Sequence, residues 1–270
     1  MPDSRPLGVF DSGVGGLTVL REIHHRLPGE STIYLGDLKH FPYGPRYQEE
    51  VKGFAFDIIN YLQERDVKLV VIACNTSTAA ALNQAREKFD IPIIGVIGPG
   101  AQAAVEATRK NLVGVISTEG TRNSQEYLHA IKDANPMVGV YQKACPELVD
   151  IVEDGDADTP RADEALRRDL AEIVQLGADV LVLGCTHYPL LRGSIDRVYP
   201  QTFQLVDSAE TTAAKVSRQL KHAGMEAPDG QMARHELIVT AVPRRFNEVA
   251  TILFGQEVPE VSEVDLWDAR

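Results

Sequence analysis

Two cysteines end apolar runs in matching contexts. Cys74 closes KLVVIAC and is followed by NTST, and Cys185 closes VLVLGC and is followed by THYP. If both runs are strands of facing parallel sheets, the two thiols approach one cavity from opposite sides. Such a pair suits the removal of a proton from one face of a carbon and the delivery of another to the opposite face. In each direction one sulfur would be the thiolate base and the other the thiol acid.

The residues after each cysteine are typical of a helix start. Thr76-Ser77-Thr78 follow Cys74, and Pro189 follows Cys185. Because a helix N-terminus favours negative charge, we expect the pKa of each thiol to be lowered from its ordinary value of about 8.5 towards neutral pH. Cys145 is expected to be an inert core residue.

Polar side chains also follow other apolar runs. FDSGVGG (10–16) supplies Asp11, Ser12 and a glycine-rich helix start whose N–H groups could hold a carboxylate. GDLKHFPYG (36–44) supplies Asp37 and a Pro42-Tyr43-Gly44 turn that can offer backbone groups. The first stretch lacks the G-x-x-x-x-G-K-[ST] pattern, so it does not predict a nucleotide phosphate site.

Three of these residues have plainer interpretations when each is taken alone. Glu153, in LVDIVEDG, ends an expected helix and is expected to approach His187, but it also fits a solvated helix end. His187 also fits a structural hydrogen-bonding residue. Asp11 also fits a helix cap.

Short apolar runs alternate with stretches of helical periodicity, which predicts an α/β protein with a parallel sheet covered on both faces. Expected strands are 7–10, 31–36, 68–74, 91–97, 111–118, 137–142 and 180–185. Expected helices are 15–27, 47–65, 77–89, 124–134 and 161–177.

The alternation repeats along the chain. GVFDSG at 8–13 and GVISTEG at 114–120 lie 106 positions apart, Tyr34 and Val140 keep that offset, and the two cysteines lie 111 apart. We therefore expect two pseudo-symmetric Rossmann-like lobes with mainly parallel sheets and the active site between them. The first lobe would comprise residues 1–97 plus 207–270 and carry Cys74. The second would comprise 98–206 and carry Cys185, with a crossover at GPGAQ (98–102).

Composition excludes several classes of protein. The 270 residues are 44% hydrophobic and carry a net charge of −12, and without a basic stripe no nucleic-acid partner is expected. No apolar run approaches the roughly 20 residues that cross a bilayer, and no signal peptide is recognisable, so a cytoplasmic location and no membrane partner are expected. Three cysteines without a C-x-x-C pair fit free thiols.

Together these motifs resemble the glutamate racemases, cofactor-independent two-cysteine amino-acid racemases of bacterial peptidoglycan synthesis. The paired ACNT and GCTHYPLL blocks are the most specific part of the resemblance. The matching stretches cover most of the chain: 8–23, 34–37, 41–44, 70–79, 95–100, 113–127, 144–155 and 180–191. Two stretches depart from the family pattern, namely Leu38-Lys39-His40 and the tail after Gly255.

The resemblance implies a role for each matching residue. Cys74 would take the α-proton of D-glutamate and Cys185 that of L-glutamate; Asp11 would assist Cys74, and Glu153 and His187 would assist Cys185. The residues implied to hold the ammonium and carboxylates are Asp11, Ser12, Tyr43, Gly44, Asn75, Thr76, Thr118, Thr121, Thr186 and His187. Without a pyridoxal electron sink, hydrogen bonds in a largely dry site must stabilise the carbanion, so closure of the lobes is expected.

The resemblance further implies no cofactor and no metal, a homodimer, supply of D-glutamate to the cell wall, and in some members activation by a UDP-muramyl precursor. Three alternatives stay open. The first is an aspartate racemase of the same fold, since substrate length depends on pocket shape, although the threonines and the GCTHYPLL block favour glutamate. A zinc-dependent hydrolase could use Cys74, Cys185, His187 and Asp11 as ligands, although the cysteines lack compact ligand spacing. A non-enzymatic module for a small ligand would not require two thiols.

Overall fold

Two parallel β-sheets form the framework of the computed structural model, which describes residues 2–241, 246–255 and 260–267. The first sheet has the strand order β10-β9-β2-β1-β3-β4. Its strands are β1 (Leu7–Asp11), β2 (Thr32–Gly36), β3 (Leu69–Ile72), β4 (Ile93–Gly95), β9 (His235–Val239) and β10 (Val261–Glu263). The second sheet has the order β6-β5-β7-β8. Its strands are β5 (Leu112–Ser117), β6 (Gly139–Ala144), β7 (Val180–Gly184) and β8 (Gln204–Asp207).

Helices cover both faces of the first sheet. Apolar side chains of α1 (Leu17–Arg26), α10 (Ser208–Ala223) and α11 (Phe246–Phe254) pack on one face. Those of α2 (Gln48–Glu64) and α3 (Asn75–Lys88) pack on the other. The strands alternate accordingly, because successive side chains point to opposite faces: Val9 joins the first core and Phe10 the second.

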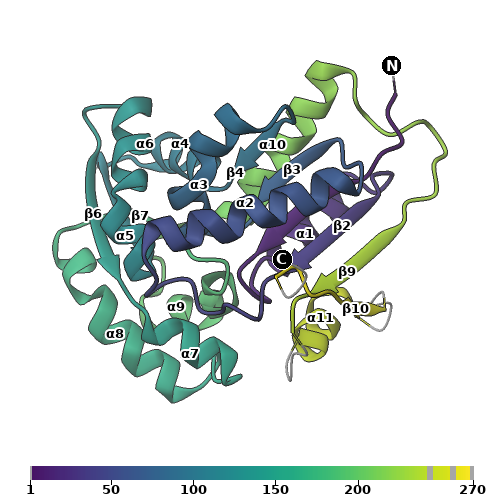
Figure 1. Cartoon of the computed structure of the whole chain (residues 1–270). Helices are drawn as coiled ribbons and strands as arrows, with labels where there is room; N and C mark the ends of the chain where they lie inside the picture. Colours follow the sequence, from purple (N-terminus) through teal and green to yellow (C-terminus); the bar gives the residue numbers. More distant parts are fainter. Residues whose placement is uncertain (1, 242–245, 256–259, 268–270) are drawn as a thin grey trace.

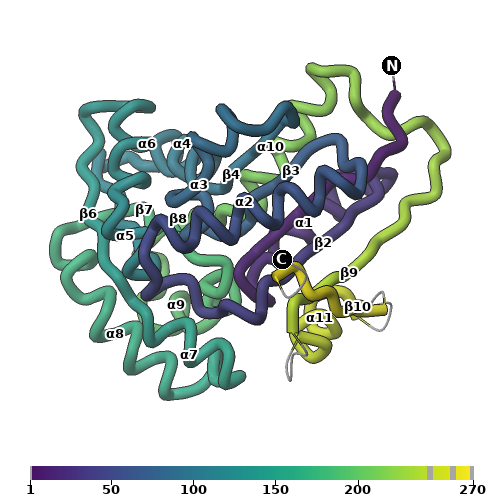
Figure 2. The backbone as a smooth tube through the Cα atoms, viewed as in Figure 1, coloured from purple at the N-terminus to yellow at the C-terminus, as the bar shows by residue number. Residues whose placement is uncertain are grey.

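The second sheet is covered in the same way. On one face lie α7 (Glu147–Glu153), α8 (Pro160–Gln175), the 3₁₀ turn η1 (Tyr188–Leu191) and α9 (Arg192–Val198). On the other lie α4 (Ile97–Ala107) and α6 (Glu126–Ala134), with the short α5 (Glu119–Ser124) before α6. Figures 1 and 2 show this sheet with its helices on the left and the first sheet on the right. The predicted α/β fold with two lobes is confirmed.

The two sheets share one internal arrangement. In each, the first strand in sequence lies between the second and the third, with the fourth outside the third. Phe10 pairs with Ile72 in the first sheet, and Ile116 pairs with Leu183 in the second. Offsets of 106 and 111 residues therefore superpose these strand pairs, as the sequence predicted.

The offset of 106 residues predicted for the second strand of each sheet, which relates Tyr34 to Val140, is wrong. Val9 pairs with Tyr34, and the equivalent Val115 pairs with Gln142. Tyr34 therefore corresponds to Gln142 rather than Val140, because the connection before β6 is two residues longer than a constant offset allows.

The chain passes between the sheets at two places. The α4 helix, which already begins at Ile97 where a strand was expected, leads from β4 to β5. After β8 ends at Asp207, α10 packs on α1 and α4. The predicted lobe boundaries, 1–97 plus 207–270 and 98–206, agree with these passages and stay a prediction; residues 242–245, 256–259 and 268–270 of the first lobe lie outside the described residues. Within the described part of the chain, no helix is long and apolar enough to span a membrane.

Candidate active site

A cavity of about 210 Å³ lies at the carboxyl ends of strands from both sheets. Both Cys74 and Cys185 line it. The other predicted site residues in its wall are Ser12, Tyr43, Gly44, Asn75, Thr76, Thr118, Thr186 and His187. The wall also includes Phe41, Pro42, Pro45, Glu119, Pro146, Val149 and Asp150, which the sequence had not singled out as site residues apart from the Pro42 turn.

Cys74 is the N-cap of α3. Its Sγ accepts a hydrogen bond from the Ser77 backbone N–H at 3.4 Å and donates to Ser12 Oγ at 3.6 Å. Burial, together with the nearby charge of Asp11, raises the pKa of Cys74 to about 11, and the Ser77 and Ser12 hydrogen bonds only partly offset this. The expected lowering of this pKa by the helix start is therefore wrong, because desolvation outweighs the helix terminus.

Cys185 stands at the head of a hydrogen-bonded chain. Its Sγ lies 3.8 Å from His187 Nδ1, and His187 Nε2 lies 2.6 Å from Glu153 Oε1. Burial alone would lower the pKa of His187, but its contacts with Cys185 and Glu153 outweigh burial and raise it to about 10. The predicted approach of Glu153 to His187 is confirmed, and Glu153 lies behind the cavity wall. The turn after Cys185 is the 3₁₀ segment η1 with Pro189 in its first turn.

Asp11 lies behind the wall on the other side. Its Oδ2 accepts hydrogen bonds of 3.0 Å from the Gly13 and Gly16 N–H groups, and its Oδ1 accepts one of 3.3 Å from Thr186 Oγ1. Burial raises the pKa of Asp11, although these three hydrogen bonds and the charge of His187 act to lower it. Asp11, the last residue of β1, therefore holds the turn before α1, whose N-cap is Gly16, and links β1 to the segment after Cys185 through Thr186.

Three threonines form a hydrogen-bonded cluster across the lobes. Thr76 Oγ1 lies 2.9 Å from Thr118 Oγ1 and 3.3 Å from Thr121 Oγ1, and Thr118 Oγ1 donates to Thr121 Oγ1 at 3.1 Å. Thr76 follows β3 of the first sheet and the other two follow β5 of the second. Thr121 supports the cavity wall from behind.

Asn75 combines a fixed carbonyl with an unpaired amide. Its Oδ1 accepts a hydrogen bond of 2.8 Å from Tyr127 Oη, whereas its buried Nδ2 has no hydrogen-bond partner among the described residues. A buried donor without a partner costs about 1–3 kcal/mol, so this amide is suited to a ligand acceptor such as a carboxylate.

Glycines let the β1–α1 turn approach both the second lobe and Asp11. A Cβ on Gly15 would overlap Thr186 and His187, and one on Gly16 would overlap Asp11 and Tyr34. The backbone at both positions therefore comes closer to its neighbours than any other residue type allows.

Cys145 does not line the cavity. It is buried in the core beneath α7 and α8, and burial raises its pKa to about 12. Within residues 2–241, 246–255 and 260–267, no group of three or more His, Cys, Asp or Glu side chains is arranged to hold a metal ion.

Comparison with known proteins gives one family. Residues 7–216 match the family model for Asp/Glu/hydantoin racemases. The chain is 44% identical over 262 residues to a glutamate racemase of Geobacter metallireducens, covering 97% of both chains. A crystal structure of glutamate racemase isoform RacE1 from Bacillus anthracis aligns with a TM-score of 0.93 and 40% identity over 97% of this chain and 98% of that one. Escherichia coli glutamate racemase in complex with L-glutamate and the activator UDP-MurNAc-Ala aligns with a TM-score of 0.80 and 32% identity over 96% and 97%.

Proposed function

Since the chain belongs to the Asp/Glu/hydantoin racemase family and is an isomerase, we propose that it interconverts L- and D-glutamate by a two-cysteine 1,1-proton transfer without a cofactor. One observation carries the proposal: Cys74 and Cys185 line the same cavity, each with its own polar partners. A cavity this small suits an amino acid. The substrates named for the relatives support glutamate as that amino acid.

In the proposed reaction the α-C–H bond of L-glutamate breaks as Cys185 accepts the proton. The electron pair stays on the α-carbon, and the thiol of Cys74 delivers its proton to the opposite face to give D-glutamate. The reverse reaction exchanges these roles. A protonated His187 held by Glu153 supplies positive charge beside Cys185 Sγ.

The pKa of Cys74 fits the same cycle. At about 11 it keeps Cys74 protonated at neutral pH and able to act as the acid. For the opposite direction the α-ammonium of bound D-glutamate would offset the charge of Asp11, which is one of the causes that raise this pKa. In the proposal Asp11 therefore assists Cys74 only together with the α-ammonium, because its charge alone raises the pKa of the thiol.

The remaining wall residues would hold the substrate. The unpaired Asn75 amide and the threonine hydroxyls are suited to the carboxylates, as are the backbone groups of Tyr43 and Gly44. The set proposed for binding is Ser12, Tyr43, Gly44, Asn75, Thr76, Thr118, Thr186 and His187 in the wall, with Asp11 and Thr121 behind it.

The test follows solvent deuterium into Cα of L- or D-glutamate with Cys74→Ser and Cys185→Ser measured separately. We expect each substitution to reduce racemisation by at least about 10³-fold, because serine is a far weaker base than a thiolate. Cys145→Ser is the matched control and should retain full activity. Full racemisation by either of the first two variants would refute the two-thiol mechanism.

The same assay separates the alternatives. Faster turnover of aspartate than of glutamate would favour an aspartate racemase. Loss of activity in chelator, restored by zinc, would favour a metal enzyme. Glutamate binding without any deuterium incorporation would favour a binding module.

The biological setting is part of the proposal. We propose that the protein supplies D-glutamate for peptidoglycan synthesis in the cytoplasm and acts as a homodimer. The activator named in the Escherichia coli structure supports a UDP-muramyl precursor as a regulator to be tested on this chain.

A further inference from the structure

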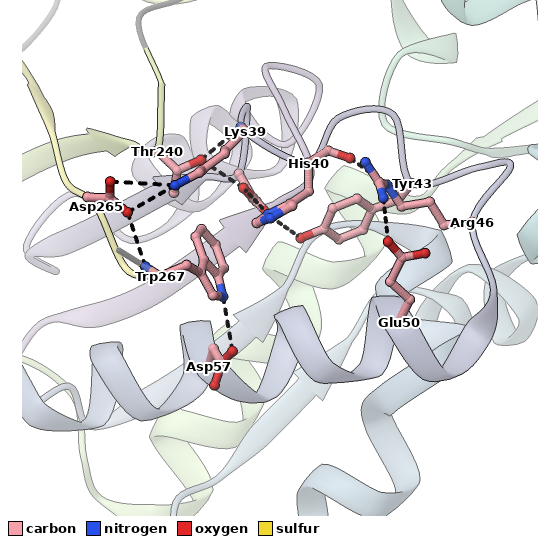
Figure 3. Close-up of polar contacts among 10 residues, drawn as sticks. Lys39, His40, Tyr43, Arg46, Glu50, Asp57, Thr240, Asp265 and Trp267 are labelled. Carbon is pink, nitrogen blue, oxygen red and sulfur yellow. Dashed lines mark hydrogen bonds and ion pairs between the residues drawn. The ribbon is translucent and has the colours of Figure 1, made fainter. Parts of the chain in front are cut away.

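The two stretches that depart from the family pattern contact each other. Lys39 Nζ lies 3.2 Å from Asp265 Oδ1, and the ring of Trp267 meets the ring of His40 edge-on with 4.4 Å between centroids. Figure 3 shows Asp265 and Trp267 reaching this loop from the C-terminal segment. We call residues 261–267 the C-terminal clasp. It pairs with β9 through β10, and none of its residues lines the cavity.

Beneath this contact lies Asp37, which is completely buried. Its Oδ2 accepts hydrogen bonds from Tyr43 Oη at 2.5 Å and His40 Nδ1 at 2.9 Å, and its Oδ1 accepts one from Thr240 Oγ1 at 2.7 Å. Thr240 Oγ1 in turn accepts the Lys39 backbone N–H at 3.0 Å. Since a buried carboxylate is tolerated only with its donors in place, the positions of these side chains depend on one another.

The clasp holds His40 against α2. Trp267 Nε1 donates to Asp57 Oδ2 at 3.0 Å, and the His40 ring stacks on Phe54 with 3.9 Å between centroids. On the far side Arg46 Nε donates to the His40 carbonyl at 2.7 Å. Without Trp267, His40 would lose the aromatic cover on its outer side and could turn towards solvent.

Tyr43 connects this network to the cavity. Tyr43 lines the cavity, and its hydroxyl donates a hydrogen bond to Asp37. The adjacent Gly44 carbonyl accepts a hydrogen bond of 2.9 Å from the Gly120 N–H of the second lobe. The Asp37 carboxylate is therefore hydrogen-bonded to the part of the wall that spans the two lobes.

We propose that the C-terminal clasp positions the cavity wall, with Trp267 and Thr240 as positioning residues that act on Tyr43 through His40 and Asp37. The part of this inference that concerns glutamate binding rests on the proposed glutamate racemase function. Because coupling between two sites is reciprocal, binding of glutamate must in turn strengthen docking of the clasp. Trp267 is the single tryptophan of the chain, so its fluorescence reports that docking directly.

The first measurement needs no ligand. Hydrogen exchange of the segment 36–47, which includes the bonded amides of Lys39 and Arg46, is compared between the unaltered protein and Trp267→Ala. We expect exchange to be at least about fivefold faster in the variant, with the rest of the first lobe unchanged. Trp267→Phe keeps a ring against His40 and should restore most of the protection.

The second measurement separates positioning from general damage. Trp267→Ala and Thr240→Val should raise KM for glutamate about 5–20-fold while kcat changes less than about twofold. Thr240→Ser should restore KM, and Thr251→Val, whose hydroxyl donates to the Asn247 carbonyl within α11, is the matched control with unchanged KM. Glutamate should shift the Trp267 emission of the unaltered protein, and Thr240→Val should reduce the shift.

Unchanged exchange in Trp267→Ala would overturn the inference whatever the substrate is. Normal KM in both variants with normal glutamate racemisation would also overturn it and leave the proposed function intact. If the unaltered protein does not racemise glutamate, the proposed function fails and the exchange measurement alone decides the positioning role.

Discussion

At the scale of single residues, the two cysteines of the cavity have different polar neighbours. Burial and the charge of Asp11 raise the pKa of Cys74 to about 11, although its sulfur has hydroxyl and amide hydrogen-bond partners. Cys185 has a histidine whose own positive charge is supported by a carboxylate. The sequence predicted both thiols and the Glu153–His187 pair. It could not predict the rise in the pKa of Cys74, because desolvation depends on what covers the sulfur and not on its neighbours in the chain.

The Glu153 carboxylate gives a prediction with a definite sign. Glu153→Gln removes a charge that raises the pKa of His187, so this pKa should fall below about 10. We expect kcat/KM to fall about 10–100-fold, equally for both enantiomers because the equilibrium constant of a racemase is one. The high-pH limb of the kcat profile should move to lower pH. Unchanged profiles would show that Glu153 is only a solvated helix end.

The same shift predicts how stability depends on pH. Since the folded pKa of His187, about 10, lies above the unfolded value of about 6.5, its contribution is complete below pH 6.5 and is lost as pH rises to 10. Denaturant titrations of the unaltered protein should show this loss. Glu153→Gln should show a smaller one, and Glu147→Gln, on the same helix and exposed, serves as the control.

At the scale of elements, strands rich in Val, Ile and Leu were predictable, and the irregular parts were not. The sequence located β1, β3, β5 and β7, whose residues are almost all buried. It gave no elements after residue 207, where β9 begins with the polar His235-Glu236 and β10 is only three residues long. The Gly-, Asn- and Ser-containing α5 was also missed, because its helix is set by the Thr118 cap and not by apolar periodicity.

Two glycines give opposite predictions for the same substitution. Gly15→Ala places a Cβ against Thr186 and His187, so we expect destabilisation of about 1–3 kcal/mol and a large loss of activity. Gly53→Ala lies within α2 where a Cβ meets nothing, and alanine should stabilise this helix by about 0.5–1 kcal/mol with unchanged activity. Chemical denaturation and racemisation assays check both. Equal effects at the two sites would contradict the close approach at Gly15.

At the scale of the whole molecule, the candidate active site and a buried ion pair lie at opposite ends of the first sheet. The cavity residues follow the carboxyl ends of the strands. Before the amino end of β3, Lys68 Nζ lies 2.6 Å from Glu30 Oε2 and donates to the Asp3 and Met225 carbonyls at 2.6 and 2.8 Å. Both charged side chains are almost fully buried. This pair joins the start of the chain to the segment that follows α10.

Breaking that pair should therefore lower stability without altering the chemistry. Lys68→Ala leaves the Glu30 charge buried without its cation, so we expect a loss of about 3–5 kcal/mol in the free energy of unfolding. Lys110→Ala, at an exposed lysine, is the control and should change stability by less than about 0.5 kcal/mol. Because the pair lies at the end of the sheet remote from the cavity, the folded fraction of Lys68→Ala should keep its kcat and KM. A fall in kcat per folded molecule would show that the amino end of the sheet also controls the geometry around Cys74, and the separation of the two ends would then be wrong.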